Sequence, residues 1–420
     1  MIKRSLKQTT LRSVAFFKVV TLATLAVSLP VPSYAEEMER DEAGLLRSVE
    51  KLEQLARTSK VRSQDKGLET KLQTIACRLA PGDCENLRIY ALDLPGFNAF
   101  VLPNGAIFIQ SGLLLRIQNE AELAAVIAHE IVHYQNSHTL ERIRKQSSSA
   151  ATYAVLGALV GAAGTVAAAG ATTPTGYNNA VAATDSAFLM LNMMQGISAL
   201  AMLDYSRDQE KEADLSGAAM LASEGYDAGA ARDLWLSYVE EDKSADRESG
   251  MSLLSTHPLP AERITYLSGL DSRDFDSNAT PSDTQIMQEI SNNRADWLLL
   301  EMRVLHPNQF SYLLESQYRL WGLNRKLVNF LKADSWVKYA NRRGISKTTA
   351  ETRLKKAFQL FQDAENGEGL TAAGYRDWGM LAYKQKNNET AIFALEKYLA
   401  AEPEAWDVKM INKRIARLKR

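Results

Sequence analysis

The sequence contains 420 residues, which is enough for two or three domains, and 46% of them are hydrophobic and 24% are charged. This composition is typical of a globular protein and excludes a fibrous or disordered one. The formal net charge of −1 is unevenly distributed, because residues 1–35 and 290–420 are net basic and residues 36–289 are net acidic, which indicates modules with different surfaces.

The N-terminus has the organisation of a signal peptide. Basic residues precede an apolar run over residues 19–31, and Ser33-Tyr34-Ala35 matches a small-residue cleavage signal. The run is too short to span a bilayer comfortably, which favours cleavage over the alternative of an uncleaved anchor. We therefore expect residues 1–35 to be a signal peptide that is removed on export.

Residues 37–80 are predicted to be helical from their apolar spacing. A short β region follows, with one strand over residues 87–92. Two further strands, over residues 99–102 and 106–110, flank a Pro-Asn-Gly turn that predicts a hairpin. Residues 120–137 are predicted to form a slim, alanine-rich helix that packs closely on its neighbours.

Two cysteines, Cys77 and Cys84, enclose the turn-forming Pro81-Gly82-Asp83. In an oxidising compartment such a pair is expected to form a local disulfide, and the alternative is two unrelated free thiols. We do not expect the cysteines to bind a metal, because a His/Glu set elsewhere in the chain accounts for a site.

That set begins with the pattern HExxH at residues 129–133. Its histidines, His129 and His133, lie one helical turn apart on one face and can reach a single zinc ion. Glu130 lies beside the metal, where it can take a proton from an activated water molecule. A structural zinc site would use four protein ligands, often cysteines. The pattern therefore predicts a zinc peptidase with one zinc ion per chain.

A second acidic pattern, ExxxD, begins 77 residues after His133 and contains Glu210 and Asp214. The two acids are four residues apart and share one helix face. Glu210 would complete the protein ligands of the metal, and Asp214 would hydrogen-bond a ligating histidine and fix its tautomer. The longer pattern HExxHxxGxxH does not fit, because Asn136 replaces the glycine and His138 falls one residue early.

Residues 146–184 contain no Asp, Glu, Lys or Arg, and residues 153–171 include a GxxxG spacing. This pattern allows helices to pack in a membrane. A buried or interfacial hairpin is favoured, because the apolar stretch only just reaches spanning length. The methionine-rich residues 188–203 are predicted to form a second apolar helix, either core or a surface for unfolded substrate. We expect at most a peripheral membrane contact through residues 150–203.

These motifs resemble those of the HtpX-type and CAAX-prenyl-protease gluzincins. The resemblance extends to residues 98–105, 206–214 and 256–264 and covers roughly residues 40–270. It implies a metalloprotease domain over residues 36–270, with a mostly helical α+β fold and a small sheet. The zinc ligands would be His129, His133 and Glu210, and Glu130 would be the general base.

The resemblance also implies a regulatory histidine. His257 would swing onto the zinc as a fourth ligand and hold the enzyme latent. Two alternatives remain: a loop histidine before a proline, and a transition-state stabiliser that never binds zinc.

Clefts in this family present an edge strand beside the metal helix, and residues 98–102 are the candidate. An extended polypeptide would pair with its backbone, with Asn98 and Phe100 as substrate-binding residues. This family includes exported members with C-terminal repeats. The resemblance to them implies a periplasmic location, and unfolded or misassembled envelope proteins as substrates.

The C-terminal part begins with a polar linker at residues 271–289. Residues 290–420 are predicted to be helical, with Tyr375, Gly379, Ala391, Leu395 and Pro403 at the offsets of a tetratricopeptide repeat. A generic helical bundle shares much of this pattern. Because at least three stacked units are expected for stability, residues 296–339 would contain degenerate repeats.

Such a tetratricopeptide-like α-solenoid would bind clients or the outer-membrane β-barrel assembly machinery. Its dispersed basic residues are interpreted as a solvated face, so no nucleic acid is expected. Two function classes remain: an endopeptidase for misfolded or stalled envelope proteins, and a chaperone-like adaptor with suppressed proteolysis.

Overall fold

A computed structural model describes residues 34–146, 205–245, 261–270 and 284–420. The chain divides into two compact units, residues 1–44 and 45–420, and the architecture below is that of the second unit. The predicted signal peptide up to residue 33, the apolar residues 150–203 and His257 lie outside the described residues.

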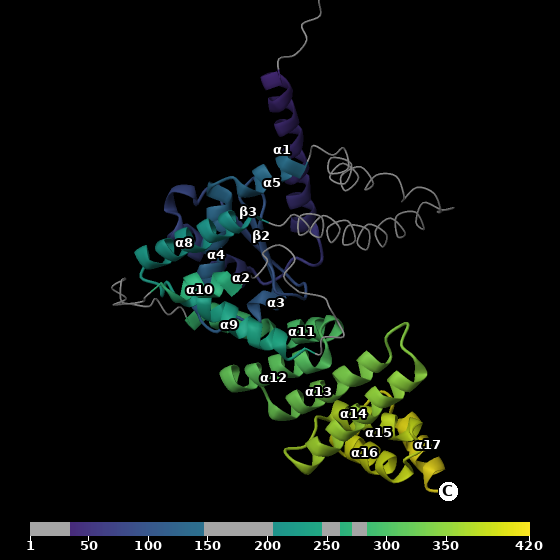
Figure 1. Ribbon diagram of the computed structural model, residues 1–420. Coiled ribbons are helices and arrows are strands. Elements are labelled where there is room, and N and C mark those ends of the chain that lie inside the picture. Colours follow the sequence, from purple (N-terminus) through teal and green to yellow (C-terminus); the bar gives the residue numbers. More distant parts are fainter. Residues whose placement is uncertain (1–33, 147–204, 246–260, 271–283) are drawn as a thin grey trace, which may run out of the picture. The chain divides into compact units, whose positions relative to one another are not determined.

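Helices dominate the part of the chain that the structure describes, as predicted (Figure 1). Those of the N-terminal two thirds are α1 (Tyr34–Thr58), α2 (Lys66–Leu79), α3 (Ser111–Leu114), α4 (Glu120–Gln135), α5 (His138–Gln146), α8 (Arg207–Ser223), α9 (Ala230–Lys243) and α10 (Ala261–Ser268). The C-terminal helices are α11 (Thr284–Val304), α12 (Pro307–Trp321), α13 (Arg325–Ala340), α14 (Lys347–Asn366), α15 (Ala372–Lys384), α16 (Asn388–Ala401) and α17 (Val408–Leu418). Within these ranges no helix is long and apolar enough to cross a membrane.

The expectation of one helical stretch over residues 37–80 was wrong in one respect. Residues 59–65 separate α1 from α2, and within them Arg62 forms an isolated antiparallel bridge with Leu92. Asp65 then caps α2, because its side chain accepts a hydrogen bond from the backbone N–H of Leu68 at 3.0 Å. The apolar spacing of the two helices did not reveal this interruption.

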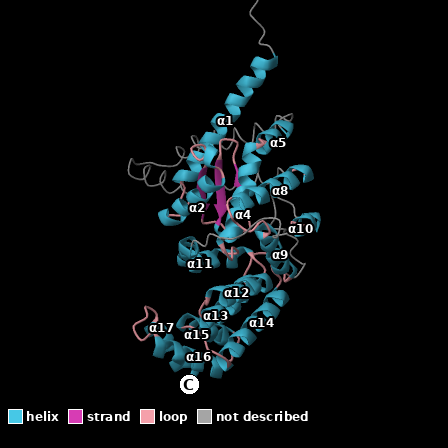
Figure 2. Cartoon of the chain, turned by 90° about the vertical axis from the view of Figure 1, so that its left-hand side faces the viewer, coloured by secondary structure: helices cyan, strands magenta, loops and turns pink. Residues whose placement is uncertain are grey.

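A three-stranded sheet lies among these helices (magenta in Figure 2). Its strands are β1 (Arg88–Leu92), β2 (Ala99–Val101) and β3 (Ala106–Gln110), in the order β1-β3-β2. β1 pairs with β3 in parallel, and β2 pairs with β3 as the predicted antiparallel hairpin. Gly105 in its turn has φ +82°, and a Cβ there would meet the carbonyl oxygen of Asn86 at 2.5 Å, so the turn requires glycine. The three predicted strands are confirmed, with β2 at an edge.

The two faces of the sheet carry different cores, because successive strand residues point to opposite sides. One face, which includes Ile107 and Val101, packs with α2 and α4 into the larger core. The other face, which includes Phe100 and Phe108, packs against the C-terminal half of α1.

The larger core also crosses the predicted domain boundary. Trp297 and Leu298 of α11 and Leu313 of α12 belong to the same buried cluster as the sheet and α4. α11 begins at Thr284, inside the predicted linker of residues 271–289, so that prediction was wrong for residues 284–289. Both helices complete the core that positions the site. The sequence pattern had assigned them to a separate module.

Farther along the chain, α15 and α16 pack closely together. A Cβ at Gly379 would meet the side chain of Leu395 at 2.7 Å, so two residues at the repeat offsets touch each other. α17 then packs on α16 through Ile411 and Ile415. The C-terminal part is helical as predicted, and its interpretation as tetratricopeptide repeats remains a prediction.

Candidate metal centre and active site

Two capped helices carry the predicted ligands. Asn119 caps α4 by accepting a hydrogen bond from the N–H of Glu122 at 2.9 Å, and Ser206 and Gln209 form a capping box at the start of α8. The helices pack side by side, and a Cβ at Gly217 of α8 would stand 3.4 Å from the backbone nitrogen of His129. This close approach brings HExxH on α4 against ExxxD on α8.

The ligand atoms of His129, His133 and Glu210 converge within 4.8 Å of one another. The two Nε2 atoms are 3.0 Å apart. Carboxylate oxygens of Glu210 lie 3.5 Å from His133 Nε2 and 3.7 Å from His129 Nε2. Ligands about 2.1 Å from a tetrahedral zinc ion would be about 3.4 Å apart. The donor types and their spacing therefore fit a zinc ion held by two imidazoles and one carboxylate.

Asp214 orients the first of these histidines. Its Oδ1 lies 2.9 Å from His129 Nδ1, so the Nδ1–H donates to the carboxylate and Nε2 is directed to the metal position. Burial opposes the charge on Asp214, but the hydrogen bond with His129 and the nearby Arg263 guanidinium outweigh it and lower the pKa of this carboxyl to about 2. Asp214 is therefore a stable anion.

Arg263 of α10 bridges both acids of α8. Its Nη1 lies 2.5 Å from Glu210 Oε2, and its Nε and Nη2 donate to the two oxygens of Asp214 at 2.8 and 2.7 Å. Tyr266 also donates to Asp214, at 2.6 Å. Arg263 is only 1% exposed, so one buried cation neutralises part of the charge of two buried carboxylates and fixes their side chains.

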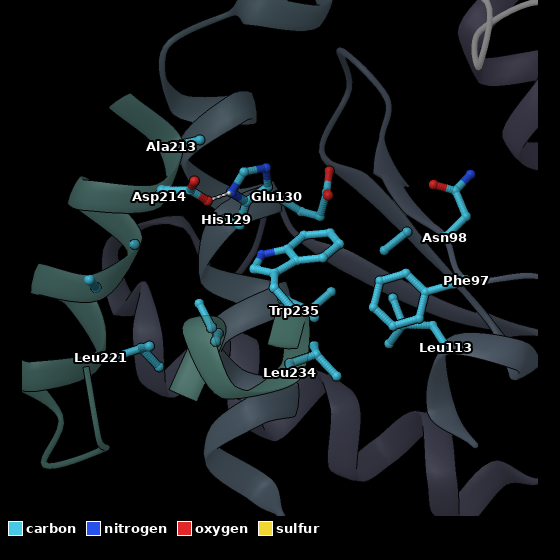
Figure 3. Close-up of a pocket in the computed structure, with 16 residues that line it drawn as sticks. Phe97, Asn98, Leu113, His129, Glu130, Ala213, Asp214, Leu221, Leu234 and Trp235 are labelled. Atoms are coloured by element: carbon cyan, nitrogen blue, oxygen red, sulfur yellow. Dashed lines mark ion pairs between the residues drawn. The ribbon is translucent and has the colours of Figure 1, made fainter. Parts of the chain in front are cut away.

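Glu130 lies in a pocket beside the ligands (Figure 3). Its carboxylate lies between His129 and the loop that carries Phe97 and Asn98. Most other lining residues are apolar or small and come from α3, α4, α8 and α9, namely Leu113, Ala125, Val126, Ala213, Gly217, Ala218, Leu221, Ala231, Leu234 and Trp235. The pocket thus places a carboxylate next to the metal position and an apolar surface next to the carboxylate.

The hairpin supplies a strand edge at this pocket. The carbonyl oxygen of Asn98 accepts from the N–H of Gln110 at 3.0 Å, and the N–H of Leu102 donates to Ala106 at 2.8 Å. Because backbone groups alternate in direction along an antiparallel strand, those of Ala99 point to the outer edge. Ala99 also lines the pocket, so backbone groups of an extended chain could pair there.

A family model described as peptidase family M48 matches residues 62–271, half of the 420 residues. The chain belongs to this family. Over 170 residues it is 35% identical to a Vibrio cholerae protein provisionally named a beta-barrel assembly-enhancing protease, covering 40% of this chain and 31% of that protein. It is 33% identical over 172 residues to the mitochondrial metalloendopeptidase OMA1 of Schizosaccharomyces pombe, covering 40% of this chain and 42% of that protein.

A third relative is the beta-barrel assembly-enhancing protease of Escherichia coli, which is 29% identical over 167 residues, 40% of this chain and 31% of that protein. The chain thus spans between about a third and two fifths of the length of these curated relatives. The matched region contains α4, α8 and α10, which hold the ligands and Arg263.

The structure separates the two residues predicted to bind substrate in this M48 site. Asn98 lines the pocket. Phe100 faces the opposite side of the sheet from Ala99 and stacks on Phe108, with 5.1 Å between ring centroids. The assignment of Phe100 to the cleft is therefore corrected, because its side chain belongs to the core under α1.

A group behind His133 was missed by the sequence analysis. His138 Nδ1 lies 3.0 Å from His133 Nδ1, and His138 Nε2 lies 3.3 Å from Glu212 Oε2. These contacts suit a chain in which His133 donates to His138 and His138 donates to Glu212. The sequence analysis used His138 only to exclude the longer motif. Its position five residues after His133 could have suggested that it hydrogen-bonds this ligand.

Tyr205 supports the same histidine from its face. The two rings stack with 3.7 Å between centroids, and the Tyr205 hydroxyl lies 2.8 Å from Thr139 Oγ1. Tyr205 is buried just before α8, and burial raises the pKa of its hydroxyl. The side chain of Tyr205 is therefore a neutral aromatic surface against which the imidazole of His133 packs.

Cys77 and Cys84 are joined by a disulfide in the structure, between the end of α2 and the residue after a short 3₁₀ helix, η1 (Pro81–Asp83). Neither cysteine lines the pocket beside Glu130 or belongs to the ligand set.

Proposed function

We propose that this chain is a zinc-dependent endopeptidase that hydrolyses unfolded or misassembled envelope proteins. The observation that carries the proposal is the convergence of His129, His133 and Glu210 on one position, with Glu130 beside them in a pocket. Three protein ligands and an adjacent carboxylate are the arrangement of catalytic zinc sites, whereas structural sites use four protein ligands. Membership of peptidase family M48 supports the same chemistry.

His129, His133 and Glu210 would hold one zinc ion per chain. When bound, zinc supplies Lewis-acid polarisation of the scissile carbonyl and promotes the ionisation of water. Asp214 holds His129 in the tautomer that presents Nε2, and Arg263 holds Glu210 and Asp214 in place. Asp214 thus acts by positioning a ligand, a more specific role than the general catalytic assignment made from its sequence spacing.

Glu130 would be the general base and then the general acid. It accepts the proton of the attacking water and delivers it to the leaving amine nitrogen. Its side chain is 2% exposed and lies at the wall of the pocket, where bulk water competes little for its proton. The expected contribution of such a group is about 10²- to 10⁴-fold in rate.

The substrate would bind as an extended strand. Ala99 directs its backbone to the outer edge of β2, and Asn98 lines the same pocket. Main-chain pairing gives affinity with little dependence on sequence. The apolar pocket beside Glu130 would add a preference for an apolar side chain near the cleaved bond. Both features favour unfolded polypeptides, because folded proteins rarely present an extended strand.

We propose a periplasmic location. Three observations support it: the signal-peptide pattern of residues 1–35, the disulfide between Cys77 and Cys84, and the likeness to the beta-barrel assembly-enhancing proteases. The C-terminal helices, interpreted as tetratricopeptide-like repeats, would bind clients or the β-barrel assembly machinery. Tyr383, Phe393 and the 85% exposed Trp406 supply aromatic surface there.

The alternative is a chaperone-like adaptor in which proteolysis is suppressed. The helical C-terminal part and its exposed aromatic residues favour it, and both functions can exist in one molecule. Glu130→Gln separates them. We expect this variant to lose cleavage of an unfolded model protein such as β-casein and to keep any client binding. Cleavage by Glu130→Gln equal to wild type would refute the peptidase proposal.

His257 is proposed as a latch that holds the enzyme latent. In the same assay His257→Ala should cleave β-casein faster than wild type. A rate equal to or below that of wild type would refute the latch, and would leave His257 either irrelevant to the reaction or part of it.

A further inference from the structure

The loop of residues 93–98 forms the wall of the pocket opposite the metal ligands. Phe97 lines the pocket and stacks on Tyr238, with 4.3 Å between ring centroids, and meets Trp235 edge-on at 5.3 Å. Asn98 follows, and then Ala99 begins the edge strand β2. Figure 3 shows Phe97 and Asn98 on the side of the pocket away from Asp214. The position of this loop therefore sets both the apolar wall and the start of the strand edge.

One helix far along the chain holds the loop at two points. Trp297 Nε1 of α11 donates to Asp93 Oδ1 at 2.8 Å. The N–H of Gly96 donates to Glu301 Oε1 at 2.6 Å. Gly96 has φ +110°, a conformation that favours glycine. Trp297 and Glu301 are four residues apart on α11 and share one helix face, so a single helix face fastens both parts of the loop.

Glu301 is itself fixed by a buried cation. Arg116 Nη2 lies 3.0 Å from Glu301 Oε2, Arg116 Nη1 donates to the carbonyl oxygen of Gly112 at 2.6 Å, and Arg116 Nε donates to Glu241 of α9 at 2.8 Å. Arg116 is 7% exposed and Glu301 is fully buried. A Cβ at Gly112 would overlap the Glu301 carboxylate and the backbone of Gly96. Moving Glu301 would therefore take one of two carboxylate partners from the buried Arg116 and the acceptor from the Gly96 N–H.

We propose that Trp297 and Glu301 are positioning residues for substrate binding: α11 holds the loop of residues 93–98 so that Phe97 and the edge of β2 can receive an extended polypeptide. The inference rests on the proposed peptidase function and deepens it. Both residues lie beyond residue 271, where the match to the M48 family ends. Helix α11, which follows the matched region, thus completes the substrate-binding wall of the pocket.

The test measures binding and metal loading separately. Fluorescein-labelled β-casein is titrated with the zinc-loaded Glu130→Gln chain and with the same chain carrying Trp297→Phe or Glu301→Gln. Trp297→Phe keeps an aromatic side chain in the core, removes the indole donor and leaves a small void beside it. Asn293→Ala is the matched control, because Asn293 lies on α11 and contacts Asp65 at 2.7 Å instead of the loop. Zinc affinity is measured on every variant by competition with a chelator.

We expect each loop variant to bind β-casein about 5- to 30-fold more weakly. Trp297→Phe loses the hydrogen bond to Asp93, and Glu301→Gln has only one acceptor oxygen for the two donors of Gly96 and Arg116. Zinc affinity and the binding of the Asn293→Ala control should stay within twofold. In the wild-type background the loop variants should raise KM and leave kcat within about threefold. Hydrogen exchange should accelerate in residues 93–101 and stay unchanged in α4 and α8.

β-Casein binding by Trp297→Phe equal to the Asn293→Ala control would overturn the proposal, and so would a parallel loss of zinc affinity, because the effect would then come through the metal site. If Glu301→Gln fails to fold, Trp297→Phe decides the question. Failure of the peptidase proposal is visible separately, as zinc-loaded wild type that does not hydrolyse β-casein, whereas binding by the Glu130→Gln chain needs no hydrolysis.

Discussion

The two walls of the site are assembled from parts that lie at very different distances along the chain. The metal wall comes from α4 and α8, whose ligands sit at helical spacing within two short motifs. The substrate wall comes from the loop of residues 93–98, which α11 holds through contacts 204 and 205 residues apart. Short motifs therefore fix the chemistry of the site, whereas long-range packing fixes the geometry of its substrate cleft.

The walls also differ in charge. Around the metal position, Glu210 and Asp214 share one cation, Arg263, and are directed at histidines. Around the loop, Phe97 and its aromatic neighbours give an apolar surface, and the charges of Arg116, Glu241 and Glu301 are buried behind it. Damage to the first wall should change metal binding and kcat, and damage to the second should change KM.

The largest effect is expected at Arg263. Arg263→Met leaves Glu210 and Asp214 buried without their cation, which should lower the free energy of unfolding by about 3–5 kcal/mol. Urea unfolding of the metal-free protein measures it. Arg263→Lys keeps the charge without the fork geometry and should lose less. A Met variant as stable as wild type would show that the metal wall does not depend on this cation.

A smaller effect is expected at His138. His138→Ala removes the partner of His133 Nδ1, and loss of such support typically weakens metal binding about 10- to 100-fold. Chelator competition measures it, with Glu141→Gln on the exposed face of α5 as the control. Unchanged zinc affinity in His138→Ala would mean that the orientation of the His133 ring does not depend on His138.

On the substrate wall, Ala231 offers a mild perturbation. Ala231→Leu places extra volume in the pocket beside Glu130 and should raise KM about tenfold for peptides with a large apolar residue near the cleaved bond. Peptides with alanine at that position serve as the internal control and should change little. An equal increase in KM for both peptide sets would contradict the proposal that this pocket binds the substrate's apolar side chain near the cleaved bond.

The smallest effect on the site is expected from the disulfide. Cys77→Ser with Cys84→Ser opens a short loop and should lower the free energy of unfolding by about 2 kcal/mol. The disulfide lies outside both walls, so KM and zinc affinity should not change. A change in KM or in zinc affinity, measured on folded protein, would mean that the metal wall or the substrate wall depends on the region around this disulfide.

The metal wall could be anticipated from sequence because helical spacing puts His129 and His133 on one face of a helix and Glu210 and Asp214 on one face of another, and the two motifs together resemble those of a zinc peptidase. The hairpin was also predictable, since Gly105 marks its turn. The errors arise where distant contacts decide the outcome. Phe100 was assigned to the cleft because the strand register was unknown, and a side chain on the other face of a strand enters a different core.

The role of α11 was not predictable for the same reason. Trp297 and Glu301 have no motif around them, and the polar stretch before α11 suggested a linker between modules. Only the folded chain shows that Glu301 accepts from Gly96 and that Trp297 belongs to the main core. Arg263 lies in a segment that resembled the family, but its two carboxylate partners follow from packing alone.

The most direct test of the account measures zinc content and hydrolysis of β-casein on the same samples of wild type, Glu130→Gln and His133→Ala. We predict one zinc ion per chain with hydrolysis in wild type, one zinc ion without hydrolysis in Glu130→Gln, and neither tight zinc binding nor hydrolysis in His133→Ala. Hydrolysis by zinc-loaded Glu130→Gln at the wild-type rate, or stoichiometric zinc in His133→Ala, would contradict the assignment of the metal wall.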